Sequence, residues 1–401
     1  MALKKLYKKM VAIDPYLSIF VGVSLFIILI GLLFRFFKQP FIIAYIVTGI
    51  IIGPHALKLI SDTGLISHIG NLGVVILLFF IGMEISLPRL LSNWKIPIIG
   101  TFFQVLISFL VVFGIGNIFG WPLGQDILLG FVITLSSTAL IIKILEEHKE
   151  LDTQTGNNVL GVLLVQDLAV IPMLIIISLL GKEATNISTF ILQLTLGIAI
   201  IGAVIWLFKH RKWKLPFSEK IKKDHELQVF AALFICFGLA LITGLFQLSA
   251  ALGAFIAGII VSAAQETKWV HQSLHSFQIV FVAAFFVSIG MLINLNFVLE
   301  HLGVIFLIVV VVLLTNTTIN AFIFKLLGES LRESLYSGAL LSQIGEFSFV
   351  LAAIGLQVGL IASFGYQITL AVISISMLLS PFGIALFRKV KCCEKKQNTI
   401  S

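Results

Sequence analysis

The chain has 401 residues, of which 59% are hydrophobic and only 11% carry a charge. Soluble domains carry about 25% charged residues, so this composition excludes a soluble globular protein and predicts an all-α polytopic membrane protein. The net charge of +8 then reflects which loops face the cytoplasm and does not indicate a nucleic-acid partner.

Apolar stretches of bilayer-spanning length recur along the whole chain, and we expect 13 transmembrane helices. In chain order the expected spans are 16–35, 41–59, 70–87, 96–119, 124–146, 156–180, 188–209, 226–246, 249–264, 277–293, 300–325, 334–356 and 364–387. An odd number of spans puts the two ends of the chain on opposite sides of the membrane.

The lysine and arginine residues select one of the two orientations. Most of them fall on the same side as the C-terminus, including the cluster "KHRKWKLPFSEKIKK" at 209–223. The positive-inside rule then predicts a cytoplasmic C-terminus and an outer N-terminus, which we expect in the inner membrane of a prokaryotic cell. The lysines between residues 4 and 9 count against this orientation.

The two halves of the chain resemble each other. Four pairs of residues in similar motifs are separated by 206–209 positions: Gly49 and Gly258, Gly82 and Gly290, Ser136 and Ser342, and Pro172 and Pro381. Because this offset spans seven expected helices, the second half is predicted to be inserted upside down. Inverted repeats are typical of alternating-access transporters, whose substrate site lies near the bilayer midplane. The expected organisation is an N-terminal tail (1–15), a first repeat (16–180), a linker helix with a basic loop (181–225), a second repeat (226–387) and a C-terminal tail (388–401).

Of the 19 acidic residues, all but three fall in loops, in tails or at the ends of the expected spans, as Asp126 does. Asp167 lies near the middle of 156–180, Glu346 in the middle of 334–356, and Glu84 toward the cytoplasmic end of 70–87. A carboxylate at the bilayer centre costs about 2.5–3.5 kcal/mol on insertion scales, so it predicts a functional site. No lysine or arginine occupies the deep interior of a span. Glu84 is expected to pair with Lys143 near the cytoplasm.

The surroundings of Asp167 indicate a chemistry. Gln166 precedes it, and Pro172 removes the main-chain hydrogen bond to Leu168, which predicts a local kink. In a dry site a carboxylate has two neutral states, because it is either protonated or paired with a monovalent cation. The proton and the cation then compete for one pair of oxygens. A carboxylate that binds neither of them is energetically unfavourable when the site moves through the low-dielectric protein. Competition and this penalty together are sufficient for obligatory exchange.

Two spans are expected to be interrupted helices, and they are mates in the repeat. Irregular backbone at this depth is tolerated only where it is buried in protein or lines a cavity. The motif "SQIGEFSF" (342–349) places Gly345 beside Glu346, after Ser342. Glu346 is expected to neutralise the positive ends of the two interrupted helices rather than to carry the ion. In "TLSSTALII" (134–142), four hydroxyl residues can satisfy freed backbone groups or offer oxygens to a cation: Thr134, Ser136, Ser137 and Thr138.

Several motifs resemble those of the monovalent cation:proton antiporters, in the branch of the Kef potassium-efflux systems. They are "SSTA" (136–139), "QDLAVIP" (166–172), "GEFSF" (345–349) and "SMLLSP" (376–381). The resemblance covers about residues 16–387. It implies an inverted-repeat antiporter fold with two crossed discontinuous helices, a core domain and a separate domain for homodimerisation. It also implies that Asp167 carries the ion and that Gln166 favours potassium over sodium.

Two departures from this family pattern affect the interpretation. Many relatives carry a lysine or arginine where this chain has Asn316, so pH dependence and stoichiometry are open, and one neutralised carboxylate predicts electroneutral 1:1 exchange. Kef systems usually continue into a cytosolic nucleotide-binding domain, whereas this chain stops about 14 residues after the last expected span. Gating by a ligand is therefore expected from a separate regulatory subunit or not at all.

The predicted function is exchange of potassium or sodium for protons by an elevator-like movement of the core. Two alternatives remain open, a cation channel on the same fold and a sodium-coupled carrier of a small organic anion. The repeat and the midplane carboxylate favour exchange, and a carrier for organic anions lacks a deep basic anchor. Histidines without metal-ligand spacing make an enzyme improbable, and no cofactor is expected besides the transported ions.

Overall fold

A computed structural model describes residues 15–36, 41–60, 62–84, 95–181, 195, 224–245, 250–263 and 268–397, and within these ranges every regular element is a helix. The helices are α2 (Pro15–Phe36), α3 (Phe41–Ile52), α4 (Thr63–Glu84), α6 (Lys95–Phe119), α7 (Leu123–Thr134), α8 (Thr138–Glu147), α9 (Gln154–Leu180), α12 (His225–Leu245), α13 (Ala250–Ala263), α14 (Lys268–Leu292), α15 (Leu295–Glu300), α16 (Leu302–Leu326), α17 (Leu331–Leu340), α18 (Phe347–Gln357) and α19 (Ser363–Gln397).

The described helices are those of a multi-pass membrane protein. Six of them contain segments long and apolar enough to cross a bilayer, and six shorter apolar helices accompany them. The six long segments are Ile19–Phe36, Lys95–Phe119, Gln154–Leu180, Glu226–Leu245, Leu302–Leu326 and Ser363–Arg388. The expected span 188–209 and the basic loop at 209–223 lie outside the described residues, so a total of 13 spans remains a prediction.

Several helix bounds differ from those expected, for a common reason. Hydropathy ends a span at its first polar residues, whereas main-chain hydrogen bonds extend α14 back to Lys268 and α19 on to Gln397. The opposite error occurs after α3, where apolar residues continue but the helix ends at Ile52. A turn follows there, in which the Lys58 N–H donates to the Gly53 carbonyl. α9 is a single helix through Pro172.

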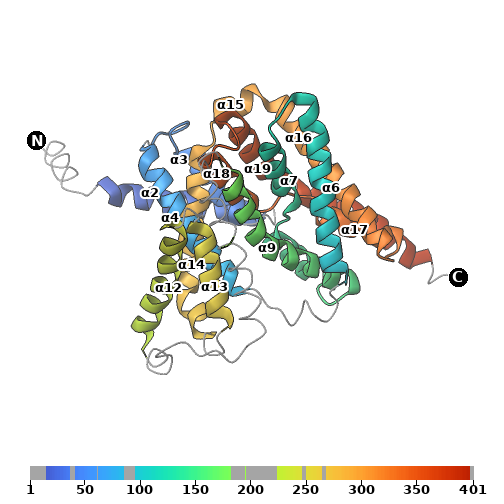
Figure 1. Ribbon diagram of the computed structural model, residues 1–401, viewed down its shortest axis with the longest axis horizontal. Helices are drawn as coiled ribbons and strands as arrows, with labels where there is room; N and C mark the ends of the chain where they lie inside the picture. The colour runs from blue at the N-terminus through green and yellow to red at the C-terminus, as the bar shows by residue number, and fades with distance from the viewer. Residues whose placement is uncertain are drawn as a thin grey trace, which may run out of the picture.

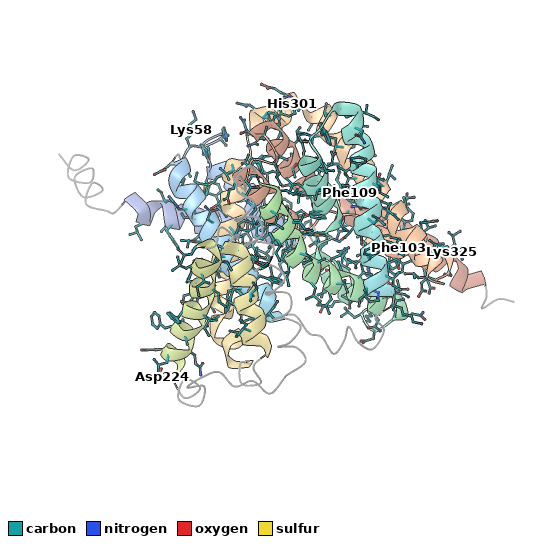
Figure 2. The ribbon with its side chains drawn as sticks, viewed as in Figure 1. Lys58, Phe103, Phe109, Asp224, His301 and Lys325 are labelled. Carbon is teal, nitrogen blue, oxygen red and sulfur yellow. The ribbon has the colours of Figure 1, made fainter. Side chains whose placement is uncertain are left out.

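The helices form two groups that pack mainly within themselves (Figure 1). One group, which we call the frame, contains α2, α3, α4, α12, α13 and α14. The other, which we call the core group, contains α6, α7, α8, α9 and α15 to α19. Each group therefore combines segments from the first and second halves of the chain. In Figure 2, Lys58 and His301 lie toward one end of the molecule and Asp224 toward the other.

Glycines allow two close helix crossings inside the frame. α3 crosses α14 where Gly49 meets Gly290, and a side chain added to either glycine would collide with the main chain of the other helix. α4 crosses α13 in the same way where Gly82 meets Gly258. Close approach of backbones through small residues is a typical means of packing helices in membranes.

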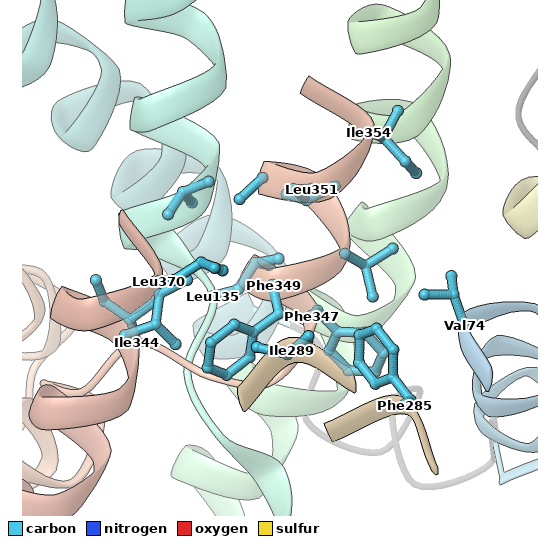
Figure 3. Close-up of a cluster of buried hydrophobic side chains, with 14 of the residues drawn as sticks. Val74, Leu135, Phe285, Ile289, Ile344, Phe347, Phe349, Leu351, Ile354 and Leu370 are labelled. Atoms are coloured by element: carbon cyan, nitrogen blue, oxygen red, sulfur yellow. The ribbon is translucent and has the colours of Figure 1, made fainter. Parts of the chain in front are cut away.

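An apolar surface joins the frame to the core group (Figure 3). Phe285 of α14 and Phe347 and Phe349 of α18 belong to one buried cluster. The ring of Phe286 meets that of Phe349 edge-on, with centroids 5.9 Å apart.

Hydrogen bonds connect the two groups at two places. The side chain of Gln367 in α19 donates to the Leu292 carbonyl (2.7 Å) and accepts from the Asn294 N–H (3.0 Å). In the second place, Gln357 at the end of α18 donates to the Asn71 side chain of α4 (3.2 Å).

Candidate functional site

Two interrupted helices meet inside the core group, as expected from their sequences. The first is broken at 135–137, between α7 and α8, and the second at 341–346, between α17 and α18. The Gly345 N–H donates to the Leu135 carbonyl (2.6 Å), so the two breaks touch. A side chain at Gly345 would lie about 2.5 Å from the Ser136 main chain, which makes glycine necessary at this contact.

The crossing satisfies carbonyl groups that the end of α7 leaves without helical partners. Four consecutive carbonyls accept hydrogen bonds from four different elements. Val132 accepts from Ser348 Oγ of α18 (2.6 Å), Ile133 from Asn316 Nδ2 of α16 (2.7 Å), Thr134 from Gln104 Nε2 of α6 (3.0 Å), and Leu135 from the Gly345 N–H (2.6 Å). The irregular backbone is therefore stabilised from several sides, as burial at this depth requires.

Asp167 lies against the start of α8. The residue is 8% exposed, and its carboxylate accepts a hydrogen bond from Thr138 Oγ1, 3.1 Å from Oδ2 and 3.4 Å from Oδ1. Thr138 is the first residue of α8, so the carboxylate faces the positive end of that helix dipole. Asp167 and Thr138 are thus the sequence-predicted oxygen ligands that the structure brings into direct contact.

The other three predicted hydroxyls hold the break together by bonding to main-chain groups. Thr134 Oγ1 donates to the Gly130 carbonyl (2.7 Å), and Ser136 Oγ donates to the Leu341 carbonyl of the second break (2.9 Å). The remaining hydroxyl, on Ser137, caps α8 by accepting from the Leu140 N–H (3.3 Å). Of the two roles that the sequence left open for these hydroxyls, the observed hydrogen bonds favour the satisfaction of backbone groups.

Gln166 is fully buried and is held between two other elements. Its Oε1 accepts from the Ser136 N–H (3.0 Å), and its Nε2 donates to Gln104 Oε1 (2.8 Å). Gln104 in turn donates to the Thr134 carbonyl. Both amide atoms of Gln166 are therefore engaged by the protein.

Asn316 is the residue at which the family resemblance led us to expect a basic side chain. It is fully buried in α16, and its Nδ2 donates both to the Ile133 carbonyl and to the Ser342 carbonyl (3.1 Å). One neutral amide therefore bridges the two breaks. Ser342 also donates through its hydroxyl to the Ala339 carbonyl (2.8 Å) at the end of α17.

We expect Asn316→Leu to destabilise the protein, because it leaves two buried carbonyls at the crossing without donors. Each such group costs about 1–3 kcal/mol, so the free energy of unfolding should fall by about 2–6 kcal/mol. A thermal melt of the purified variant in detergent measures the loss. Thr318→Val is the matched control, because Thr318 bonds only within its own helix at an exposed position. Equal melting temperatures for the Asn316 variant and the wild type would contradict this account.

The remaining predicted residues are placed as follows. Glu346 immediately precedes α18 at its N-cap position and is 8% exposed, so it stands at the positive end of that helix. Glu84 is the last residue of α4, but its side chain lies outside the described part of the chain. The expected pairing of Glu84 with Lys143 of α8 therefore stays a prediction.

Sequence reasoning missed several buried polar residues, among them Gln104 and Asp126. Gln104 lies on the buried face of α6 with Thr101 and Ser108, a spacing of three and four residues that places polar groups on one side of the helix. That spacing is the sequence signal from which the buried polar face of α6 could have been predicted. Asp126 was counted as a helix end, yet it is 1% exposed in the first turn of α7, with Gly116 of α6 packed against its carboxyl group.

Comparisons with known proteins identify the family. The family model described as "Sodium/hydrogen exchanger, transmembrane" matches residues 22–389. The chain is 32% identical over 376 residues to "Iron transporter MagA" of Paramagnetospirillum magneticum, covering 94% of this chain and 86% of that protein. It is 29% identical over 357 residues to "K(+) efflux antiporter 5" of Arabidopsis thaliana. That match covers 88% of this chain but only 63% of the plant protein.

A solved structure shares the fold. The sodium proton antiporter MjNhaP1 from Methanocaldococcus jannaschii superposes with a TM-score of 0.68 at 16% identity, covering 93% of this chain and 96% of that one. The antiporter fold and the resemblance drawn from the motifs are therefore confirmed. Because the family model matches nearly the whole chain, the chain belongs to the transmembrane sodium/hydrogen exchanger family, whose members are transporters and not enzymes.

Proposed function

We propose that this protein exchanges a monovalent cation for protons, with Asp167 as the group that binds each in turn. The observation that carries the proposal is the contact of the buried Asp167 carboxylate with Thr138 beside the break in α7 and α8. It joins an ionisable group, a neutral oxygen ligand and irregular backbone near the middle of α9. Carboxylate and hydroxyl oxygens are the ligands that small hard cations prefer.

The hydroxyl of Thr138 suits both loaded states of Asp167. It donates to the carboxylate when the carboxylate is charged, and its lone pairs can face a cation or accept from the protonated acid. A bare carboxylate in a dry site is penalised by several kcal/mol. Proton and cation therefore replace each other, and exchange is coupled without a second ionisable group.

Four finer assignments belong to the same proposal. Potassium is the favoured cation, because Gln166 precedes Asp167 and a relative is named as a potassium efflux antiporter. Exchange is electroneutral, one cation for one proton, because the place of the usual basic residue is taken by the neutral amide of Asn316. The protein acts as a homodimer, with a separate regulatory subunit if ligand gating exists. It lies in a prokaryotic inner membrane with its C-terminus in the cytoplasm.

The glycine crossings of the frame support alternating access through an inverted repeat. The sequence pairs Gly49 with Gly258 and Gly82 with Gly290. A twofold operation that exchanges these pairs converts the Gly49–Gly290 contact into the Gly258–Gly82 contact, and the structure contains both. Two halves related in this way can expose one central site to either side by the same movement.

The decisive experiment is a proton-flux assay on the purified protein in liposomes. Gradients of potassium, sodium and lithium are applied in turn, with the membrane voltage either free or clamped. The proposal expects proton movement driven by a cation gradient, strongest with potassium and unchanged by the clamp. Cation flux without proton counter-flow would instead assign a channel, and flux that requires an added organic anion would assign a carrier.

Thr138→Val tests the hydroxyl contact. Removing one neutral oxygen ligand of the bound cation should weaken cation binding by about 1.4 kcal/mol or more, so the KM for the cation should rise about tenfold while exchange persists. Thr138→Ser retains the hydroxyl and should keep a KM near that of the wild type. A valine variant with an unchanged KM would remove Thr138 from the ion-binding residues.

A further inference from the structure

Gln104 and Gln166 form a relay of hydrogen bonds between three elements. Gln104 Nε2 donates to the Thr134 carbonyl (3.0 Å), Gln166 Nε2 donates to Gln104 Oε1 (2.8 Å), and the Ser136 N–H donates to Gln166 Oε1 (3.0 Å). Both glutamines and Thr134 are fully buried, and Ser136 is 1% exposed. The relay thus runs from the last residue of α7, through α6 and α9, back to the middle of the break.

The two ends of the relay fix the direction of both amides. A carbonyl such as that of Thr134 can only accept, so Gln104 must turn its Nε2 toward it and its Oε1 toward Gln166. A main-chain N–H such as that of Ser136 can only donate, so Gln166 must turn its Oε1 toward the break. The nitrogen and oxygen positions, which a side-chain shape alone leaves ambiguous, are determined here by the backbone.

We propose that Gln104 is a positioning residue of the exchange site, which acts on the transported cation through Gln166 and the 135–137 break. This inference rests on the proposed function, since it assumes that Asp167 binds the cation. Gln166 and Asp167 are consecutive in α9, so the relay fixes the break relative to the carboxylate. Both amide atoms of Gln166 are already bonded, to Gln104 and to Ser136. Gln166 therefore affects the cation preference through the position of the break, and this preference depends on how firmly the relay holds the break.

The relay also predicts that position 166 is sensitive to its residue type. An aspartate there can only accept hydrogen bonds, so it would place a carboxylate against Gln104 Oε1, another acceptor. Gln104 would have to turn over to serve the aspartate, and the Thr134 carbonyl would lose its donor. Positions 104 and 166 are therefore coupled, although they belong to different helices.

The test measures the KM for potassium and for sodium in proteoliposomes for Gln104→Met, Gln166→Met and the double variant. Methionine keeps the length of the side chain and removes its hydrogen bonds. Each single variant should raise the KM for potassium about tenfold and change the sodium-to-potassium KM ratio. The double variant should also show about a tenfold rise rather than a hundredfold one, because either substitution already breaks the relay.

Ser108→Ala is the matched control for Gln104. Ser108 lies one turn away on the same buried face of α6, and its hydroxyl has no hydrogen-bond partner among the described residues. This control should leave both KM values unchanged. An unchanged KM for folded Gln104→Met, a multiplicative effect in the double variant, or an equal effect of Ser108→Ala would each overturn the proposal.

Gln104→His provides a second test should the methionine variant fail to fold. A neutral imidazole has one donor and one acceptor and can complete the relay, whereas a protonated imidazole has two donors and cannot accept from Gln166. Relative to the wild type, its potassium KM should therefore rise as pH falls below about 6.5. If the ratio of the potassium KM of Gln104→His to that of the wild type does not change with pH, the proposed role of Gln104 is overturned. Persistence of exchange in Asp167→Asn would instead refute the proposed function itself.

Discussion

Asp167→Asn is expected to abolish cation-driven proton movement and to leave the protein folded. The amide has nearly the shape of the carboxyl group and can still bond to Thr138, so the packing of α9 should survive. An amide neither binds and releases a proton nor balances the charge of a cation, so neither loaded state can form. Proton flux in liposomes should fall to the level of protein-free vesicles, while the melting temperature stays equal to or above that of the wild type.

Asp126→Asn is the matched control for this experiment. Asp126 is also a buried aspartate of the core group, but it lies in the first turn of α7, away from the break at the other end of that helix. Its substitution should preserve exchange. Full activity in the Asp167 variant would end the carrier assignment, and equal inactivity of both variants would show that the loss is not specific to Asp167.

Gly345→Ala is expected to abolish exchange by separating the two interrupted helices. The three atoms nearest to an added side chain all belong to the main chain of Ser136 and Ser137, at 2.5–2.7 Å, so no side chain can move aside to relieve the clash. Overpacking of this kind costs about 1–3 kcal/mol, and the hydrogen bond to the Leu135 carbonyl lengthens or breaks. Flux and melting temperature should both fall, as measured in the same liposomes and in detergent.

The control for this variant is Gly365→Ala in α19. Only Ile361 approaches an added side chain there, at 3.9 Å, which is ordinary van der Waals contact. Alanine also favours a helix over glycine by about 1 kcal/mol, so this variant should melt at the same or a higher temperature and keep its activity. An active, stable Gly345→Ala protein would show that the two breaks need not touch.

The parts of the site that were predictable from sequence are those that contrast with their surroundings. Asp167 and the hydroxyl cluster at 134–138 stand out because a bilayer-spanning segment has few reasons to contain them. Gly345 beside Glu346 marked the second break in the same way. The meeting of the two breaks was expected from the sequence and from the family resemblance, and the structure supplies its hydrogen bonds.

What sequence could not provide is the pairing of polar groups between helices. Asn316 was interpreted as the loss of a basic residue that would pair with the site. In the structure its amide donates to two carbonyls, which lie 183 and 26 residues away in the chain. Gln104 gave only a weak signal, because a helix face that carries one threonine, one glutamine and one serine predicts no particular contact. Helix ends were least predictable where apolar residues continue into a turn, as they do after Ile52.

The apolar surface between the frame and the core group has a kinetic consequence. Contacts between rings such as Phe286 and Phe349 are individually weak and have no fixed donor or acceptor. When one group is displaced along the other, such contacts are exchanged for others of similar energy, whereas directional hydrogen bonds such as those of Gln367 and Gln357 must break outright. The speed of displacement should therefore respond to temperature and to the fluidity of the lipid, and hardly at all to ionic strength.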